Sequence, residues 1–300
     1  MDTQHTHWNF LSRYSWVFLL ISLIFLIIST VSLGLYQFRL GVDFSGGSVL
    51  DVSFQDKSKL PQTADEVRVV AEDVSPVERV SLTDANVTMR LPSIDETKKE
   101  LILDRFTEKF GEVEEKRFLQ VGASIGQELV RKTAIALILA LVGSMVYLAV
   151  RFQSLSYGTT ALLAVIHDGI ILLGAFSLFG KLYGVEIDIL FVTALLTTVS
   201  FSLHDTVVVF DRVRERQKRR YKETLTQTID HAVEETLVRS IRNSTAILLL
   251  LVALLLLGGS TLRWFGVALF IGTVSGTYSS TFVALPLLVL WEKIKKKRGK

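Results

Sequence analysis

Six long apolar runs and one long polar segment divide the chain. The runs cover residues 15–36, 133–150, 152–180, 187–210, 243–262 and 264–291. Each is about 18 to 29 residues long, and a helix needs about 20 residues to cross a hydrocarbon core about 30 Å thick. The pattern therefore predicts six transmembrane helices. The first run is longer than the apolar part of a secretory signal, so we expect it to remain as a membrane anchor.

The polar segment between the first two runs is typical of a small α+β domain. Strands are expected at 47–54, at 77–82 and 87–91 as a hairpin through 83–86, and at 114–121. A helix over 63–73 opens with the capping-box pair Thr63 and Glu66, and a helix over 95–110 ends at Gly111. The order β-α-β-β-α-β is that of a ferredoxin-like domain.

Lys and Arg residues lie mainly on one side of the expected membrane. Residues 211–242 and the C-terminal tail are rich in them, whereas 181–186 and 258–263 hold one basic residue each. The positive-inside rule then puts both termini in the cytoplasm. The predicted layout is a cytoplasmic N-terminus (1–14), the first transmembrane helix (15–37), an extracytoplasmic domain (38–130), transmembrane helices two to four (131–210), a cytoplasmic loop with an amphipathic helix (211–238), transmembrane helices five and six (239–291) and a basic cytoplasmic tail (292–300).

Composition agrees with a membrane protein and excludes several kinds of site. Hydrophobic residues make up 49% of the chain and the mean hydropathy is +0.41, too apolar for an ordinary soluble domain. The absence of cysteine excludes disulfides, thiolate catalysis and cysteine-based metal sites. No Walker lysine motif, HExxH or GxSxG is present, so neither an enzyme nor a metal or organic cofactor is expected. The basic stretches lack interleaved aromatic residues, which argues against nucleic-acid binding.

Two aspartates within the apolar runs are the candidates for chemistry. Asp168 is near the middle of the third run, and Asp205 lies about 9 Å inside the cytoplasmic boundary of the fourth, six residues before Asp211. Charging an acid at membrane depth costs several kcal/mol, so such acids usually handle ions. Helical spacing puts Ser202 and Thr198 on the face of Asp205, as a polar stripe directed into the bundle.

A cation stands near Asp205 in the predicted layout. Arg239 begins the fifth helix at about the same depth, and burial raises the pKa of a carboxylic acid whereas a nearby cation lowers it. Asp205 and Arg239 are therefore predicted to form a proton-dependent pair, and His167 and Asp168 to belong to the same relay. The alternatives are that Asp205 and His167 are hydrogen-bonded packing groups and that Arg239 only marks topology.

Glycines mark two further positions. Residues 272–276 form a GxxxG motif, which indicates that another helix, from this chain or a partner, packs closely there. Residues 41–47 are glycine-rich and are expected to make a tight turn from the membrane into the first strand.

Five stretches of the chain together resemble the SecF family, the smaller subunits of the SecD/SecF accessory complex of the bacterial protein-export translocase. The stretches are GVDFSGG (41–47), VGASIGQEL (121–129), HDGIILLGAFSLFG (167–180), SLHDTVVVFDRVRE (202–215) and TLVRSIRNST (236–245). The resemblance implies half of an RND-superfamily transporter unit in the bacterial cytoplasmic (inner) membrane, paired with SecD. It implies that the proton motive force, rather than a cofactor, helps a preprotein leave the SecYEG channel, with YajC and YidC as further partners and lipid around the helices.

The resemblance also implies roles for particular residues. Asp205 and Arg239 match positions implicated in proton conduction, with a second acid expected from SecD. His204 stands where many members carry Asn. The motif positions with a structural role are Asp43, Gly46, Gly47, Asp211 and Arg212.

Two other functions fit parts of the sequence. An RND-superfamily exporter of small molecules or lipids would have the same helices and would work without SecD. An intramembrane aspartyl hydrolase would use Asp168 and Asp205 as a dyad sharing a proton, which requires contact between them. Their expected depths differ by about half a leaflet, which disfavours the hydrolase.

Overall fold

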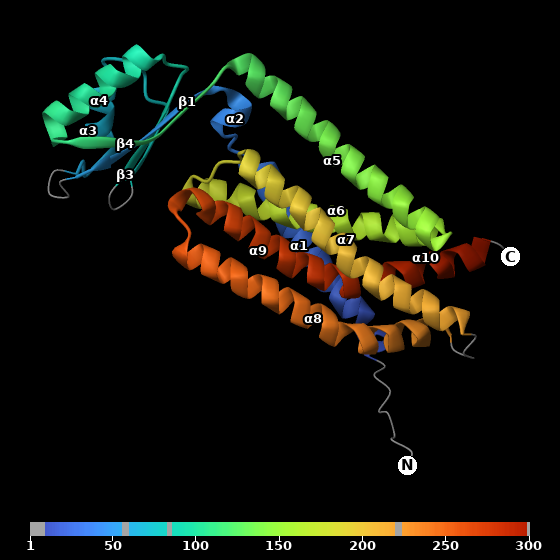
Figure 1. Ribbon diagram of the computed structural model, residues 1–300. Coiled ribbons are helices and arrows are strands. Elements are labelled where there is room, and N and C mark those ends of the chain that lie inside the picture. Colours follow the sequence, from blue (N-terminus) through green and yellow to red (C-terminus); the bar gives the residue numbers. More distant parts are fainter. Residues whose placement is uncertain (1–9, 56–59, 83–85, 220–223, 299–300) are drawn as a thin grey trace. The chain divides into compact units, whose positions relative to one another are not determined.

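The computed structural model of this 300-residue chain describes residues 10–55, 60–82, 86–219 and 224–298. These residues form two compact units (Figure 1), one comprising Leu40–Ala134 and the other comprising the chain before and after it. Most of the turn expected at 83–86 lies outside the described residues. Each unit has its own hydrophobic core.

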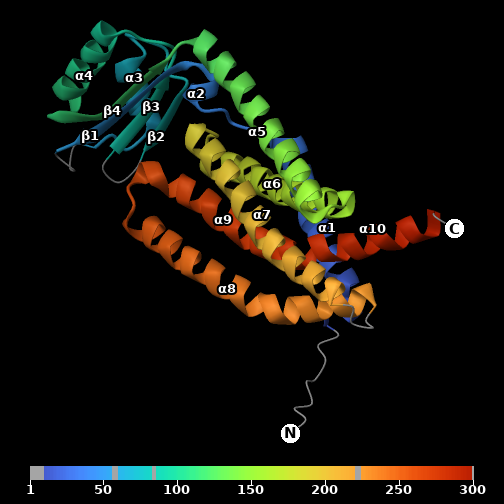
Figure 2. The ribbon, with the colours of Figure 1, turned by 45° about the vertical axis from the view of Figure 1, so that its right-hand side comes forward.

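The smaller unit is an antiparallel sheet covered by helices (Figure 2). Its strands are β1 (Gly47–Phe54), β2 (Arg79–Leu82), β3 (Asn86–Leu91) and β4 (Val113–Val121), in the spatial order β2-β3-β1-β4. Its helices are α2 (Val42–Ser45), α3 (Ala64–Ala71) and α4 (Glu96–Phe110). The order of elements and the antiparallel pairing confirm the predicted ferredoxin-like domain.

Local sequence signals account for these elements. Burial alternates along β1, so that Leu50, Val52 and Phe54 face the core. The hydroxyl of Thr63 accepts a 3.3 Å hydrogen bond from the backbone N–H of Glu66 and caps α3. The predicted return bond of the capping box differs, because the Glu66 carboxylate accepts from the N–H of Gln62, at 3.0 Å, and not from that of Thr63. Asp95 caps α4, and its carboxylate accepts a 3.0 Å bond from the N–H of Lys98.

The larger unit is a bundle of long helices. They are α1 (Phe10–Tyr36), α5 (Ala123–Phe152), α6 (Leu155–Tyr183), α7 (Ile189–Lys218), α8 (Leu225–Leu257), α9 (Ser260–Phe282) and α10 (Ala284–Arg298). α5 begins in the smaller unit and continues into this one. Six segments of the described chain are long and apolar enough to cross a membrane, which agrees with the six predicted spans.

The sixth apolar run does not form one uninterrupted helix. It divides into α9 and α10 at Val283, whose φ and ψ of −117° and −55° depart from helical values. Pro286 lacks the N–H that would bond to the carbonyl of Phe282, so the hydrogen-bond ladder is interrupted there. α10 leaves the direction of α9 beyond this point (Figures 1 and 2). The prediction of a single helix over 264–291 was wrong in this respect.

The sequence predicts one amphipathic helix over 212–238, and this prediction is also wrong. Its first part belongs to α7 and its second part to α8, so both helices extend beyond their apolar runs. Arg212 bonds the Glu235 carboxylate and Arg216 Nη1 lies 2.8 Å from it, which ties the two extensions together. Thr224 starts α8 with a capping box to Gln227.

The GxxxG motif on α9 packs against another helix of the same chain. A side chain at Gly272 would collide with Thr198 of α7, and a Cβ at Gly276 would lie 3.2 Å from that of Ser202. The two glycines therefore let α7 and α9 approach closely, and the described chain itself supplies the neighbouring helix.

Candidate functional site

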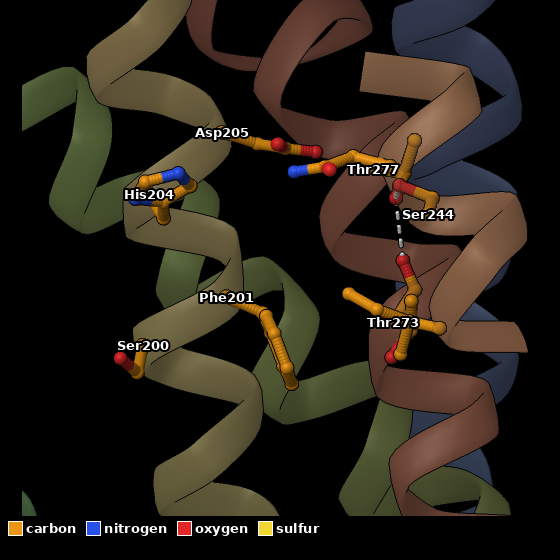
Figure 3. A pocket seen from close by; sticks show the side chains of 9 residues that line it. Ser200, Phe201, His204, Asp205, Ser244, Thr273 and Thr277 are labelled. Carbon is orange, nitrogen blue, oxygen red and sulfur yellow. Dashed lines mark hydrogen bonds between the residues drawn. The ribbon is translucent and has the colours of Figure 1, made fainter. Parts of the chain in front are cut away.

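Asp205 lines a polar cavity between α7, α8 and α9. The cavity has a volume of about 340 Å³, and its lining residues are Ser200, Phe201, His204, Asp205, Asn243, Ser244, Ile247, Thr273 and Thr277. Figure 3 shows Asp205 projecting from α7 toward Ser244 and Thr277 on the opposite wall. The hydroxyls of Ser244 and Thr277 are themselves joined by a 2.6 Å hydrogen bond. We call this space the Asp205 cavity.

The carboxylate of Asp205 has a defined partner on α8. Ser240 Oγ donates a 2.8 Å hydrogen bond to Asp205 Oδ2, and Ser240 is buried while Asp205 is half-buried. A hydroxyl donated to a carboxylate makes a charge-assisted bond, stronger than one between neutral groups. This contact fixes the direction of the acid relative to α8.

A second cavity lies farther along the same pair of helices. It has a volume of about 370 Å³ and is lined by Val208, Asp211, Arg212, Glu215, Glu235, Thr236 and Arg239, and we call it the Arg239 cavity. No ion pair within 4.0 Å joins Arg239 to Asp205 in the described part of the chain. The acid contacts Ser240, the residue after Arg239. The switching pair Asp205–Arg239 stays a prediction for another state of the protein.

Asp168 is the centre of a separate, buried cluster. Its side chain is 1% exposed, and three serine hydroxyls donate hydrogen bonds to it. Ser202 of α7 lies 2.7 Å from Oδ2, Ser279 of α9 lies 2.6 Å from Oδ2, and Ser275 of α9 lies 2.6 Å from Oδ1. His167 Nδ1 is 3.1 Å from Oδ1. A single carboxylate on α6 thus connects three helices.

The predicted polar stripe on α7 divides between these two places. Ser202 and Thr198 are buried against α9, and Ser202 bonds to Asp168. Asp205 faces α8 instead. The two carboxylates therefore have different donors, and no hydrogen bond joins them in the described residues, as an aspartyl dyad would require.

Sequence reasoning missed several residues of this site. Ser240, Asn243 and Ser244 lie in the stretch 236–245 that carries the family resemblance, but no role was predicted for them. Thr277 gave no signal beyond being polar within a span. Ser275 and Ser279 stand four residues apart on α9, which puts both hydroxyls on one helical face. Nothing in the sequence indicated that this face meets Asp168.

Three of the motif residues, Asp43, Gly46 and Gly47, line neither cavity and shape the turn before β1. Gly46 and Gly47 have φ values of +76° and +112°, and Gly47 lies where a Cβ would be 2.8 Å from the carbonyl oxygen of Leu91. Asp43 lies in the first turn of α2, beside them in sequence. The glycines thus allow the turn into β1.

The remaining two motif residues lie near the Arg239 cavity. Asp211 Oδ2 is 2.6 Å from Arg151 Nη2, which ties the end of α5 to α7. Arg212 bonds Glu215, at 2.5 Å, and Glu235. Both residues belong to a network of ion pairs across the ends of these helices.

The polar groups of the Asp205 cavity and the Asp168 cluster include hydroxyls, carboxylates, the amide of Asn243 and the imidazoles of His167 and His204. Such groups can bind, hold and pass a proton. The described residues contain no cluster of three or more His, Cys, Asp or Glu side chains that could hold a metal ion.

Comparison with known proteins connects this geometry to a family. The family described as "Protein export membrane protein SecD/SecF, C-terminal" matches residues 102–294, and the "SecD/SecF GG Motif" matches residues 31–57, which include Gly46 and Gly47. The protein translocase subunit SecF of Thermobaculum terrenum is 39% identical over 294 residues, covering 93% of each chain. That of Synechocystis is 38% identical over 266 residues, covering 85% of this chain and 84% of its own.

A solved structure agrees with these matches. The crystal structure of SecDF from Thermus thermophilus, a translocon-associated membrane protein, superposes with a TM-score of 0.84 and 30% identity. The match covers 98% of this chain and 40% of the SecDF chain, so this chain spans less than half of that protein. The chain therefore belongs to the SecF family of SecD/SecF protein-export membrane proteins.

Proposed function

We propose that this chain is the SecF-type subunit of an accessory complex of the Sec protein translocase. It would assist the passage and release of preproteins across the bacterial cytoplasmic membrane by using the proton motive force. The observation that carries this proposal is the similarity to translocase SecF subunits along almost the whole chain, together with a titratable acid in a polar cavity within the bundle. The chain would work without an organic cofactor or a metal.

The partner that completes the unit is SecD. The matching SecDF protein is a longer chain, of which this one spans 40%. We infer that a separate SecD chain supplies the other half of the transporter and the second acid facing Asp205. SecYEG and the preprotein follow as partners from this role, with YajC and YidC as accessory contacts, and the basic flanks support cytoplasmic termini.

The energy available is adequate for such a role. Moving one elementary charge through 100 mV releases about 2.3 kcal/mol, so one proton crossing at about 150 mV supplies about 3.5 kcal/mol. That is enough to shift a two-state equilibrium several hundredfold. Protonation of Asp205 weakens its charge-assisted bond to Ser240, and the contact between α7 and α8 changes with it. No covalent bond other than those to the proton is made or broken.

A complementation experiment tests this role. In a bacterial strain depleted of its own SecF-type subunit, this chain and its cognate SecD should restore export of a pulse-labelled preprotein. A protonophore at constant ATP should remove the restored part. A small-molecule exporter would instead leave preprotein export unchanged and would work without SecD, so failure to restore export would contradict the proposal.

A further inference from the structure

One hydrogen bond lies between the two cavities of the α7–α8 pair. Along α7, the lining of the Asp205 cavity ends at Asp205 and that of the Arg239 cavity begins at Val208. Along α8, the lining of the Arg239 cavity ends at Arg239 and that of the Asp205 cavity begins at Asn243. On α8 the gap between the two linings includes Ser240, which donates its hydrogen bond to Asp205, the last lining residue of the Asp205 cavity on α7.

The two cavities differ in their chemistry. Asp205 is the ionisable acid among the residues lining its own cavity, beside His204 and neutral hydroxyl and amide groups. The Arg239 cavity holds three carboxylates, from Asp211, Glu215 and Glu235, with two arginines. These carboxylates are paired with Arg151, Arg212 and Arg216, so water in this cavity would take up a proton that leaves Asp205. Direct access from Asp205 to both cavities would let protons pass without any accompanying movement of the helices.

We propose that Ser240 is a positioning residue that holds the Asp205 carboxylate in the Asp205 cavity and prevents uncoupled transfer of its proton into the Arg239 cavity. The inference rests on the proposed proton-driven function. Ser240 is 6% exposed and lines neither cavity, as expected of a group that separates them. When Asp205 takes up a proton from water in its own cavity, the donated bond becomes one between neutral groups and weakens. The contact opens, and the proton passes to water in the Arg239 cavity.

The charged groups around Asp205 leave the hydrogen bond from Ser240 as the contact that controls the position of its carboxylate. α7 contributes His204, and α8 contributes Arg239 on the far side of Ser240. The wall from α9 offers the hydroxyls of Thr273 and Thr277. Asp168 of α6 accepts hydrogen bonds from three serines, and within the described residues no hydrogen bond joins it to Asp205. Among the described side chains, Ser240 is therefore the hydrogen-bond partner that links the acid to α8.

Passive proton influx measures this separation directly. The complex of this chain with SecD is reconstituted in vesicles that contain a pH-sensitive dye, and a pH step is applied without preprotein. Ser240→Ala should raise the rate of influx about tenfold. Loss of a charge-assisted hydrogen bond lowers the barrier to proton transfer by about the free energy that corresponds to this factor. Ser240→Thr, which keeps the hydroxyl, should stay near the wild-type rate. Thr245→Ala is a matched control on α8, because its hydroxyl bonds at 2.7 Å to its own helix, at Ile241.

A double variant separates this role from simple damage to the bundle. In Ser240→Ala/Asp205→Asn the influx should return to the wild-type rate or below, because the added protons travel through the Asp205 carboxyl group. Influx that persists in the double variant, or that does not rise in Ser240→Ala, would overturn the proposal. A third outcome separates the two proposals. If influx rises in Ser240→Ala and falls again in the double variant, but export does not depend on the proton motive force, the role of Ser240 is supported and the proposed translocase function is contradicted.

Discussion

Asp168 on α6 and Ser279 on α9 are joined by a 2.6 Å hydrogen bond between side chains that are 1% and 0% exposed. Ser275 and Ser202 complete the set of hydroxyls that satisfy this carboxylate. A buried carboxylate is tolerated only where donors replace its water, and here α7 and α9 supply them. The cluster should therefore contribute to the stability of the bundle as well as to any relay.

Replacing Asp168 by Asn should destabilise the bundle. The amide keeps one acceptor oxygen and gains a donor, so the three serines compete for fewer acceptors. At least one buried hydroxyl loses its partner, at a cost of about 1–3 kcal/mol. The thermal unfolding midpoint of the detergent-purified complex should fall. An unchanged midpoint would show that the serines find other partners, as hydroxyls on helices do when they bond to their own backbone.

Replacing Asp205 by Asn should leave the protein inserted and assembled with SecD but remove the proton-dependent stimulation of export. Asn fills the same space and still accepts the hydrogen bond from Ser240, but it does not titrate. Export is measured at equal expression, with and without a protonophore. Asp188→Asn is the matched control, because Asp188 caps α7 at 2.8 Å from the N–H of Phe191 and Asn caps equally well. Wild-type export in Asp205→Asn would contradict the role of the acid.

Arg239 and Asp205 should prove to be coupled although they do not touch in this state. If both take part in one proton-dependent event, Asp205→Asn and Arg239→Ala should be equally defective and the double variant no worse than either. Lys at position 239 should rescue only in part, because an ammonium keeps the charge but loses the planar fork. The measurement is the logarithm of the export rate at a controlled proton motive force. Additive defects would mean that Arg239 acts only as a topology signal.

The ferredoxin-like unit should fold as an isolated fragment of about residues 40–122. Its core is built from its own residues, with Leu50, Met89 and Phe106 each 0% exposed. Circular dichroism of the purified fragment should show mixed helix and sheet with a cooperative unfolding transition. A disordered fragment would mean that the unit needs its SecD counterpart in order to fold.

The stability of that fragment should depend on the ionisation of Asp51. Burial in the sheet raises the pKa of Asp51 above its ordinary value of 3.8, against the opposing effects of a hydrogen bond from Thr88 and the charge of Arg117. The folded state therefore binds this proton more tightly than the unfolded state. The contribution of Asp51 to the free energy of unfolding is greatest below pH 3.8 and is lost as the pH rises through the folded-state pKa.

Asp51→Asn isolates this effect. At pH 7 the variant should resist urea better than the wild type, because no charge has to be buried, and the difference should shrink as the pH falls toward 3. Urea midpoints at several pH values measure it. Equal midpoints at every pH would show that Thr88 and Arg117 fully offset the cost of burying the charge.

Local signals made the small unit predictable. The strand at 47–54 was predicted with the bounds that β1 has, because apolar residues alternate along it. The caps at Thr63, Asp95 and Gly111 located both helices within a residue or two. These signals act within a few positions of the chain, so they are legible without knowledge of the tertiary structure.

The candidate site was predictable only in part. Depth in the membrane singled out Asp205 and Asp168, since an acid in an apolar run is rare. Their partners depend on which helices meet, and Ser275 and Ser279 lie 107 and 111 residues from Asp168 in the chain. The break at Val283 was missed because the apolar run continues through it, although Pro286 stands three residues beyond.

The serine bonds to Asp168 have a mechanical consequence. α6, α7 and α9 are held at one interior point, and the close approach at Gly272 and Gly276 fixes α7 against α9 along its length. These three helices should therefore move as a rigid body. α8 is held against it by the bonds of Ser240 to Asp205 and of Ser244 to Thr277 and by ion pairs to Glu235. Protonation of Asp205 weakens one of these contacts, so the work done by a proton would appear at the boundary between α8 and the rigid body.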